Sequence, residues 1–246
     1  MKKPVSIVTG AAKGIGKAIA LQLKNDGFFV VIADMDVEGG KLLEAELGTK
    51  NSRFIPCNIS NENDVQQFFE HARKISGSID VVVNNAGIIR DNMIWKMSVE
   101  EFDAVIAVNL RGTWLMCREA AQLMKEQNFG RIINIASRAW LGNPGQSNYS
   151  ASKAGIVALT RVLALELGRY NVFVNAIAPG LIDTPLTQKL EQTVLQKLIE
   201  AQPTKTMGKP EDVARAVSFL ANSKTQFITG QLIYVDGGKS IGANLF

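Results

Sequence analysis

A tyrosine and a lysine lie four positions apart in SRAWLGNPGQSNYSASK, the stretch that runs from Ser137 to Lys153. On an α-helix, positions i and i+4 share one face, so Tyr149 and Lys153 would lie side by side. A free tyrosine has a pKa of about 10, and a nearby ammonium group would lower it. The pair therefore predicts a general acid or base, with Ser137 at a strand end donating to a substrate oxygen. Because an ordinary surface helix could also carry this pair, the stretch needs support from the rest of the chain.

A glycine-rich segment, TGAAKGIG, follows the first apolar run and contains Gly10, Gly14 and Gly16. Gly10 can form a tight turn, and Gly14 lets the backbone approach a pyrophosphate at a helix N-terminus. Gly16 allows that helix to pack closely on a strand. Asp34 follows at the end of the second apolar run, where a carboxylate can accept hydrogen bonds from an adenosine ribose. Together these residues predict a dinucleotide-binding site.

The charges around Asp34 indicate which dinucleotide binds. A carboxylate at this position would repel a 2′-phosphate, and Asp36 adds to the negative charge, so the sequence favours NAD. No arginine or lysine directly follows Asp34, as a typical phosphate clamp would require. Lys13 acts in the opposite direction, because a cation inside the glycine loop could pair with that phosphate. NADP therefore stays open as the less favoured cofactor.

Short apolar runs alternate with longer helical patterns along the chain, which predicts a doubly wound α/β fold. Most of the runs are apolar on both faces, as expected for parallel strands covered on both sides. The expected strands are 5–9, 29–33, 53–57, 79–84, 131–136, 172–178 and 232–236. The expected helices are 15–26, 37–47, 61–76, 99–127, 150–169 and 210–222. With no linker or repeat in 246 residues, a single domain over 1–246 is the simplest prediction.

The segment 181–209 departs from this alternation as a long insertion after the sixth expected strand. Its helix-like pieces are bounded by Pro185 and Pro203. Insertions at the carboxyl ends of parallel strands often form lids over a site. We therefore predict a helical substrate lid, with a plain surface hairpin as the alternative.

Composition excludes several classes of function. Cys57 and Cys117 fit no metal-binding spacing, and we expect them to be reduced core thiols. The only histidine, His71, lies on the polar side of an expected helix, which argues against a zinc site or a histidine-based triad. The net charge of +4 is scattered, so nucleic acid is not an expected partner. No apolar run could span a bilayer and MKKPVSIVTG is no signal peptide, so a cytoplasmic protein is expected.

These motifs, in this order, resemble the classical short-chain dehydrogenases/reductases. The resemblance rests on TGAAKGIG, Asp34, NNAG at 84–87, VNL at 108–110, Ser137, the Tyr149–Lys153 pair and PG at 179–180. It implies a Rossmann-type seven-stranded parallel sheet in a three-layer α/β/α arrangement. It also implies an NAD(P)-dependent enzyme that interconverts a secondary alcohol and a ketone by hydride transfer, without a metal. Its members commonly form homotetramers through helices that correspond to 99–127 and 150–169, both apolar on more than one side here.

The resemblance assigns a role to each matching residue. Ser137, Tyr149, Lys153 and Asn109 would be catalytic, with Lys153 also bonding the nicotinamide ribose and Asn109 holding a water that links Lys153 to solvent. The other positions would bind the dinucleotide. They are Thr9, Gly10, Lys13, Gly14, Ile15 and Gly16 for the phosphates; Asp34 for the ribose; Asn58 and Ile59 for the adenine; Asn85, Ala86 and Gly87 for the adenosine side and the central sheet; and Pro179, Gly180, Ile182 and Thr184 for the nicotinamide end.

The substrate is less sharply indicated. The stretch IIRDNMIWKM and the tail FITGQLIYVDGG resemble the branch that reduces 3-oxoacyl thioesters of acyl carrier protein or coenzyme A, usually with NADPH. Because Asp34 favours NAD, oxidation of a 3-hydroxyacyl thioester is the expected direction. A polyol, sugar or aromatic alcohol dehydrogenase and a non-catalytic cofactor-binding subunit are the alternatives. Trp140 and Trp95 either line an aromatic substrate pocket or are simply packed.

Overall fold

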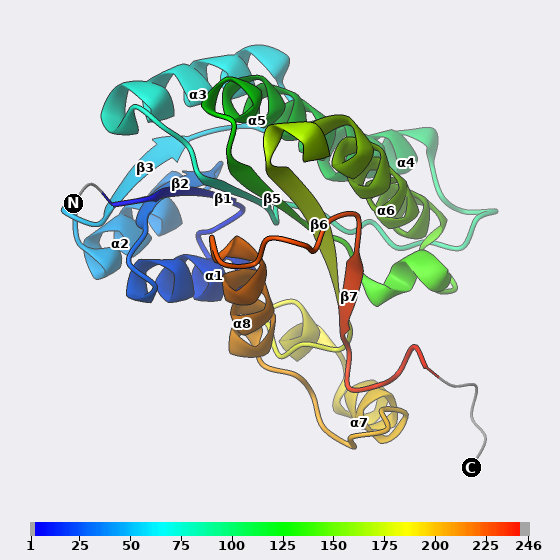
Figure 1. Cartoon of the computed structure of the whole chain (residues 1–246). Helices are drawn as coiled ribbons and strands as arrows, with labels where there is room; N and C mark the ends of the chain where they lie inside the picture. The colour runs from blue at the N-terminus through cyan, green and yellow to red at the C-terminus, as the bar shows by residue number, and fades with distance from the viewer. Residues whose placement is uncertain (1–2, 242–246) are drawn as a thin grey trace.

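A computed structural model of the chain describes residues 3–241 and contains a seven-stranded, fully parallel sheet (Figure 1). The strand order is β3-β2-β1-β4-β5-β6-β7, so the order reverses between β1 and β4. The strands are β1 Val5–Thr9, β2 Phe29–Asp34, β3 Ser52–Pro56, β4 Val81–Asn84, β5 Gly130–Ile135, β6 Val172–Pro179 and β7 Leu232–Val235. The predicted doubly wound fold is confirmed. Ligands of such sheets bind outside the carboxyl ends of the strands, at the point of reversal.

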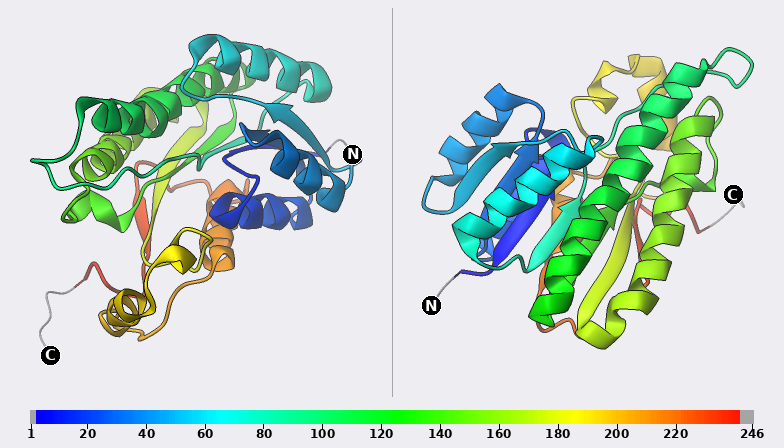
Figure 2. Two further views of the ribbon diagram at one scale, coloured as in Figure 1. Left: turned by 180° about the vertical axis from the view of Figure 1, so that it is seen from behind. Right: turned by 90° about the horizontal axis from the view of Figure 1, so that it is seen from above.

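Helices cover both faces of the sheet and produce three layers (Figures 1 and 2). One face carries α1 Gly14–Asn25, α2 Val37–Leu47 and α8 Pro210–Ala221, and the other carries α3 Glu62–Ser76, α5 Thr113–Gln127 and α6 Ser147–Leu167. Successive strand residues enter different cores: Ile32 packs with the first group of helices, whereas Val31 packs with the second. This alternation is the physical reason why the strand runs are apolar on both faces.

The stretch expected as one helix over 99–127 is divided into three parts. Helix α4, Val99–Val105, leads into a π-helical segment, Ile106–Gly112, and then into α5. The prediction of an uninterrupted α-helix is therefore wrong at its centre. Asn109 in the wide turns is held by the backbone of Ile88. Apolar periodicity does not distinguish a π turn from an α turn, and such turns are frequent at functional sites.

Two boundaries differ from expectation beside the catalytic candidates. Strand β5 ends at Ile135, so Ser137 does not end the strand but precedes a 3₁₀ helix, Arg138–Leu141. Its hydroxyl oxygen accepts a hydrogen bond from the Ala139 amide at 3.1 Å, which starts that turn. Helix α6 begins at Ser147 rather than at position 150. Tyr149 therefore lies inside the first turn of α6.

The insertion 181–209 is closed at its base and helical within. Gly208 donates its amide to Leu181 O at 3.0 Å, and Asp183 donates to Gly208 O at 2.8 Å. Between these bonds lie a 3₁₀ turn, Thr187–Lys189, and α7, Gln192–Glu200, which has no buried residue. Helix α7 lies outside the three layers in Figure 1. The insertion is thus tied at its base and carries an exposed helix, and its role as a lid stays a prediction.

Two further expectations concern the bounds of the domain and the absence of a membrane-spanning helix. The predicted domain, 1–246, extends past both ends of the structure, because residues 1–2 and 242–246 lie outside the described range. A further 3₁₀ turn, Gly168–Tyr170, completes the elements. Within residues 3–241, no helix combines the length and the apolar character that a membrane crossing requires.

Candidate active site

The first turn of α6 is fixed by a buried asparagine that precedes Tyr149. The Asn148 side chain is fully buried and donates to Arg90 O at 2.8 Å, while its oxygen accepts from the Tyr149 amide at 2.6 Å. Gly145 O also accepts from the Asn92 amide at 2.9 Å. The loop after β4 therefore holds the start of α6. Sequence reasoning did not single out Asn148, and its only signal was its place before the tyrosine.

Tyr149 and Lys153 lie on one face of α6, beside the end of β5. Lys153 is 3% exposed, and its Nζ donates to Ile135 O at 2.8 Å. The same Nζ lies 5.5 Å from the centroid of the Tyr149 ring. The Ser137 side chain lies near enough to Tyr149 to lower its pKa, which brings the serine of the opening stretch back to the tyrosine. Three residues of the predicted constellation thus meet at the carboxyl end of β5.

The expected lowering of the Tyr149 pKa is wrong for this arrangement. Burial raises the pKa of Tyr149; the hydrogen bond with Ser137 lowers it by less, and the charge of Asp91 raises it further. Burial also lowers the pKa of Lys153 to about 8. Desolvation disfavours the charged form of each group. Tyr149 therefore stays protonated at neutral pH, which is the form that a general acid needs.

The buried lysine predicts a pH dependence of stability. Below pH 8 both folded and unfolded chains hold the Lys153 proton, whereas between about 8 and 10.5 only the unfolded chain does. Because the unfolded chain then binds more protons, this group makes the free energy of unfolding rise with pH across that window. We expect wild type to gain on the order of 3 kcal/mol relative to Lys153→Met between pH 7 and 11. Urea unfolding of both nucleotide-free proteins measures this; a pH-independent difference would contradict it.

Asn109 is fully buried in the π-helical segment and faces the same site. Its side-chain oxygen accepts from the Ile88 amide at 2.8 Å, and its nitrogen donates to Ile88 O at 3.0 Å. A Cβ added at Gly87 would lie 3.2 Å from Asn109 Oδ1 and 3.6 Å from Lys153 Nζ. Gly87 therefore lies between the side chains of Asn109 and Lys153, and it has no side chain of its own to keep them apart. A second bond of the Asn109 amide, to Ser152 Oγ, was not foreseen from the sequence.

The glycine loop has the geometry of an anion cradle. Gly10 and Gly14 have φ values of +62° and +57°, which favour glycine. A Cβ at Gly10 would lie 2.7 Å from Ala86 Cα, and one at Gly16 would lie 2.1 Å from Gly10 O. The residue before α1, Lys13, provides no side-chain cap, and no acidic residue lies in the first turn. The backbone amides in the first turn of α1, including that of Ile15, are thus available to a phosphate.

Asp34 ties the second strand to this loop. Its two carboxylate oxygens accept hydrogen bonds from the amides of Ala12 at 2.9 Å and Asp36 at 3.0 Å. The Asp36 side chain instead caps α2 through the Gly39 amide. The half-buried Asp34 carboxylate thus lies beside the glycine loop, while Lys13 is exposed and makes no ion pair among the described residues.

The turns after β1 and β4 hold each other in place. Thr9 Oγ1 accepts from the amides of Asn85 and Ala86, at 2.9 and 3.0 Å. The Asn85 side chain donates to the carbonyl oxygens of Thr9 and Gly10, at 3.0 and 2.9 Å. These bonds bring the predicted phosphate and adenosine residues to the reversal of strand order between β1 and β4.

The central sheet depends on a residue that was not predicted as functional. Asn84 is 3% exposed, and its Nδ2 donates to Asn134 Oδ1 at 2.8 Å and to Cys117 Sγ at 3.2 Å. This network connects β4 with β5 and α5. Cys117 and Cys57 are free and buried, as expected, and burial raises the pKa of each thiol to about 12.

The adenine candidates lie after β3. Asn58 Oδ1 accepts from the amide and hydroxyl of Ser60, at 3.1 and 2.7 Å. The Ile59 side chain is buried and packs near Gly112 of the π-helical segment. The part of Ile59 that can flank a ligand is therefore its backbone.

The nicotinamide candidates follow β6. Gly180 approaches β7 so closely that a Cβ there would lie 2.7 Å from Asp236 Cα. Pro179 ends β6, and Ile182 is buried where the lid segment closes on Gly208. A Cβ at Gly14 would lie 3.9 Å from Thr184 Cγ2. The lid segment thus lies beside the glycine loop, which is where a dinucleotide would bind.

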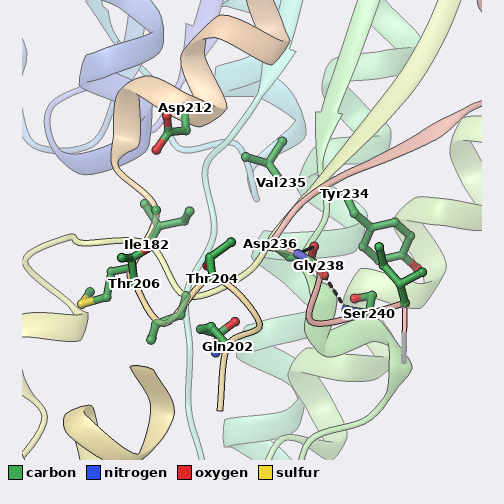
Figure 3. Close-up of a pocket in the computed structure, with 15 residues that line it drawn as sticks. Ile182, Gln202, Thr204, Thr206, Asp212, Tyr234, Val235, Asp236, Gly238 and Ser240 are labelled. Atoms are coloured by element: carbon green, nitrogen blue, oxygen red, sulfur yellow. Dashed lines mark hydrogen bonds between the residues drawn. The ribbon is translucent and has the colours of Figure 1, made fainter. Parts of the chain in front are cut away.

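A pocket of about 630 Å³ lies at the base of the lid (Figure 3). Its lining is mainly apolar and includes Ile182, the only predicted site residue among the described lining.

Trp95 and Trp140 do not line this pocket. The Trp95 side chain is 73% exposed. Trp140 donates its indole N–H to Tyr234 Oη at 2.9 Å and lines a second pocket of about 540 Å³ between α6 and β7. Trp95 and Trp140 thus do not line either of these two pockets together. No cluster of metal-ligating side chains occurs within residues 3–241, and His71 is exposed on α3.

Comparisons with known proteins show the family to which the chain belongs. The family model described as enoyl-(acyl carrier protein) reductase matches residues 10–240. The chain is 42% identical to the (2S)-[(R)-hydroxy(phenyl)methyl]succinyl-CoA dehydrogenase subunit BbsD of Thauera aromatica, over 97% of each chain. It is 40% identical to the 3-oxoacyl-[acyl-carrier-protein] reductases FabG of Aquifex aeolicus and Thermotoga maritima, over 95% of this chain and 96% of each relative. The protein belongs to the short-chain dehydrogenase/reductase family of nicotinamide-dependent oxidoreductases.

Proposed function

We propose that the protein interconverts 3-hydroxyacyl and 3-oxoacyl thioesters with NAD as the preferred cofactor. The observation that carries this proposal is the convergence of Ser137, Tyr149 and Lys153 at the end of β5. A second site, the glycine loop with Asp34, lies on the same edge of the sheet. A proton-transfer group and a dinucleotide cradle are together what alcohol–ketone interconversion requires.

The residues present fit a dinucleotide. The uncapped first turn of α1 and the positive-φ glycines offer amides to the pyrophosphate. Asp34 offers a carboxylate to the adenosine ribose and repels a 2′-phosphate, which favours NAD over NADP. The bound nicotinamide supplies or accepts the hydride. Lys153, beside Tyr149, would bond the nicotinamide ribose.

The protein's own groups handle the proton. In the reductive direction, Tyr149 Oη donates a proton to the developing alkoxide oxygen, and burial keeps that proton in place at neutral pH. In the oxidative direction the same oxygen accepts the alcohol proton, so oxidation is favoured as pH rises. Ser137 orients the substrate oxygen, and Asn109 with Lys153 completes a path for proton exchange.

The relatives support the thioester class. Two are named as reductases of 3-oxoacyl groups on acyl carrier protein, and a third as the dehydrogenase subunit for a coenzyme A thioester with a hydroxyl group beside a phenyl ring. Both names describe an oxygen on the carbon β to a thioester carbonyl. The second name also gives a reason to test an aryl substituent at that carbon.

Initial-rate kinetics with NAD and NADP test the proposal. The panel is 3-hydroxybutyryl-CoA, a 3-aryl-3-hydroxypropionyl-CoA, a sugar alcohol and a benzylic alcohol without a thioester. We expect turnover of at least one thioester, with NAD preferred. Turnover of only the free alcohols would favour the polyol or aromatic alternative, and nucleotide binding without any turnover would favour a non-catalytic subunit.

We also propose a homotetramer. Apolar side chains remain exposed on α4, α5 and α6, including Val99 at 70%, Trp114 at 44% and Leu165 at 86%. Phe219 and Phe227 are exposed on a separate part of the surface. Separate apolar patches suit a closed assembly with more than one two-fold axis. Light scattering at micromolar concentration is expected to give four times the chain mass of 26.7 kDa, and a monomer would contradict this.

A further inference from the structure

Ser152 connects Asn109 with the turn of α6 that carries Tyr149. Its side chain is fully buried, and its Oγ donates to Tyr149 O at 2.7 Å. The same oxygen accepts from Asn109 Nδ2 at 3.3 Å. On a helix the residue three positions after Tyr149 is its neighbour on the surface, and its hydroxyl bonds back to the Tyr149 carbonyl. Ser152 is thus the only described side chain that hydrogen-bonds to both Asn109 and the Tyr149 turn.

The hydrogen-bond inventory makes a hydroxyl group necessary at this position. The Asn109 amide has two N–H donors, of which one goes to Ile88 O and the other to Ser152 Oγ. Its oxygen accepts from the Ile88 amide. Ser152 must therefore accept from Asn109 while its single proton goes to Tyr149 O. An alanine would leave a buried amide N–H without a partner, and that amide would rotate to find another.

We propose that Ser152 is a positioning residue that fixes the Asn109 side chain relative to Tyr149 and Lys153. This inference rests on the proposed function. Asn109 lies in π-helical turns, which are frequent at functional sites. Its side chain also lies next to Gly87, whose added Cβ would be 3.6 Å from Lys153 Nζ. A rotation of the Asn109 amide would therefore change the surroundings of the Lys153 ammonium.

The test compares Ser152→Ala with Ser150→Ala. Ser150 lies in the same turn, and its buried hydroxyl has no hydrogen-bond partner, so its removal breaks no bond. We expect kcat for thioester turnover to fall about tenfold in S152A and to stay near wild type in S150A, with nucleotide affinity unchanged in both. The pH profile of kcat should shift in S152A alone, because the Lys153 surroundings change. Equal kcat and pH profiles in S152A and wild type would overturn the proposal.

A double-mutant cycle with Asn109→Ala tests the coupling directly. If Ser152 acts through Asn109, the S152A change has little further effect in the N109A background. Additive losses would show that Ser152 acts independently and would overturn the proposal. Should S152A fold poorly, Ser152→Cys preserves the volume with a weak donor and should give an intermediate kcat.

A structural readout separates this inference from the proposed function. Crystal structures of S152A and S150A should show a rotated Asn109 amide in the first variant only. An unmoved amide in S152A overturns the positioning role. Absence of thioester turnover in wild type, with the amide rotated in S152A, refutes the proposed function but leaves the role of Ser152 in orienting Asn109 supported.

Discussion

Replacing Tyr149 by phenylalanine is expected to lower kcat for thioester turnover by about 10²–10⁴-fold. The ring and its packing remain, but the hydroxyl that lies near Ser137 and would exchange the substrate proton is lost. Nucleotide affinity should stay close to wild type, because the glycine loop and Asp34 do not depend on that hydroxyl. Steady-state rates in both directions and nucleotide fluorescence titration measure the two effects separately.

Tyr170→Phe provides the matched control for this substitution. Tyr170 lies in the 3₁₀ turn after α6, where the side chains of Arg169 and Lys125 stack on its ring, away from the proposed site. We expect its kcat to equal that of wild type. A Y149F enzyme that retains more than about a tenth of wild-type kcat would place the proton donor elsewhere. Since burial raises the Tyr149 pKa, wild-type reduction should be independent of pH near neutrality and decline only in alkali.

Replacing Asp34 by asparagine is expected to reduce the preference for NAD over NADP by about 100-fold, measured as the ratio of kcat/KM values. The change removes a negative charge from the position where a 2′-phosphate would lie. An asparagine replaces one of the two carboxylate oxygens with an NH₂ donor, so it cannot accept from the Ala12 and Asp36 amides through two separate oxygens as Asp34 does. We therefore expect the absolute kcat/KM with NAD to fall as well.

Asp36→Asn separates this local effect from the general charge of the loop. Asp36 is exposed and caps α2 through the Gly39 amide, and asparagine is an equally good cap. The same unit of charge is removed, so a purely long-range effect would change the cofactor ratio equally in both variants. We expect a much smaller change in D36N. Equal changes, or an unchanged ratio in D34N, would contradict a specific role for Asp34.

Local patterns predicted the layers of the protein well. The seven apolar runs became the seven strands with ends shifted by only a few residues, and helix 37–47 has the predicted bounds. The reason is that a buried parallel strand needs apolar residues on both faces, whatever lies elsewhere in the chain. The glycine loop could also be predicted from the sequence, because its positive φ values and the close approach of Gly10 to Ala86 require glycine.

Hydrogen bonds between segments far apart in the chain could not be predicted from the sequence. Asn84 bonds to Asn134 and Cys117, which lie 50 and 33 positions away, and no local pattern records such pairings. Asn109 in the π-helical turns bonds to Ile88, 21 positions earlier, and this pairing is equally absent from any local pattern. Apolar periodicity in 99–127 reports which side of a helix is buried, but it does not report how wide the turns are.

The opening stretch shows the same division. Its sequence determined that a serine, a tyrosine and a lysine would be carried on a turn and a helix, with Tyr149 and Lys153 on one face. Only the tertiary structure decided their electrostatics: burial raises the pKa of Tyr149 and lowers that of Lys153, against the expectation from their proximity. It also decided that the hydroxyl of Ser152 would accept a hydrogen bond from the Asn109 amide. Spacing fixes which side chains are neighbours on a helix, whereas pKa values and hydrogen-bond partners depend on how deeply other segments bury them.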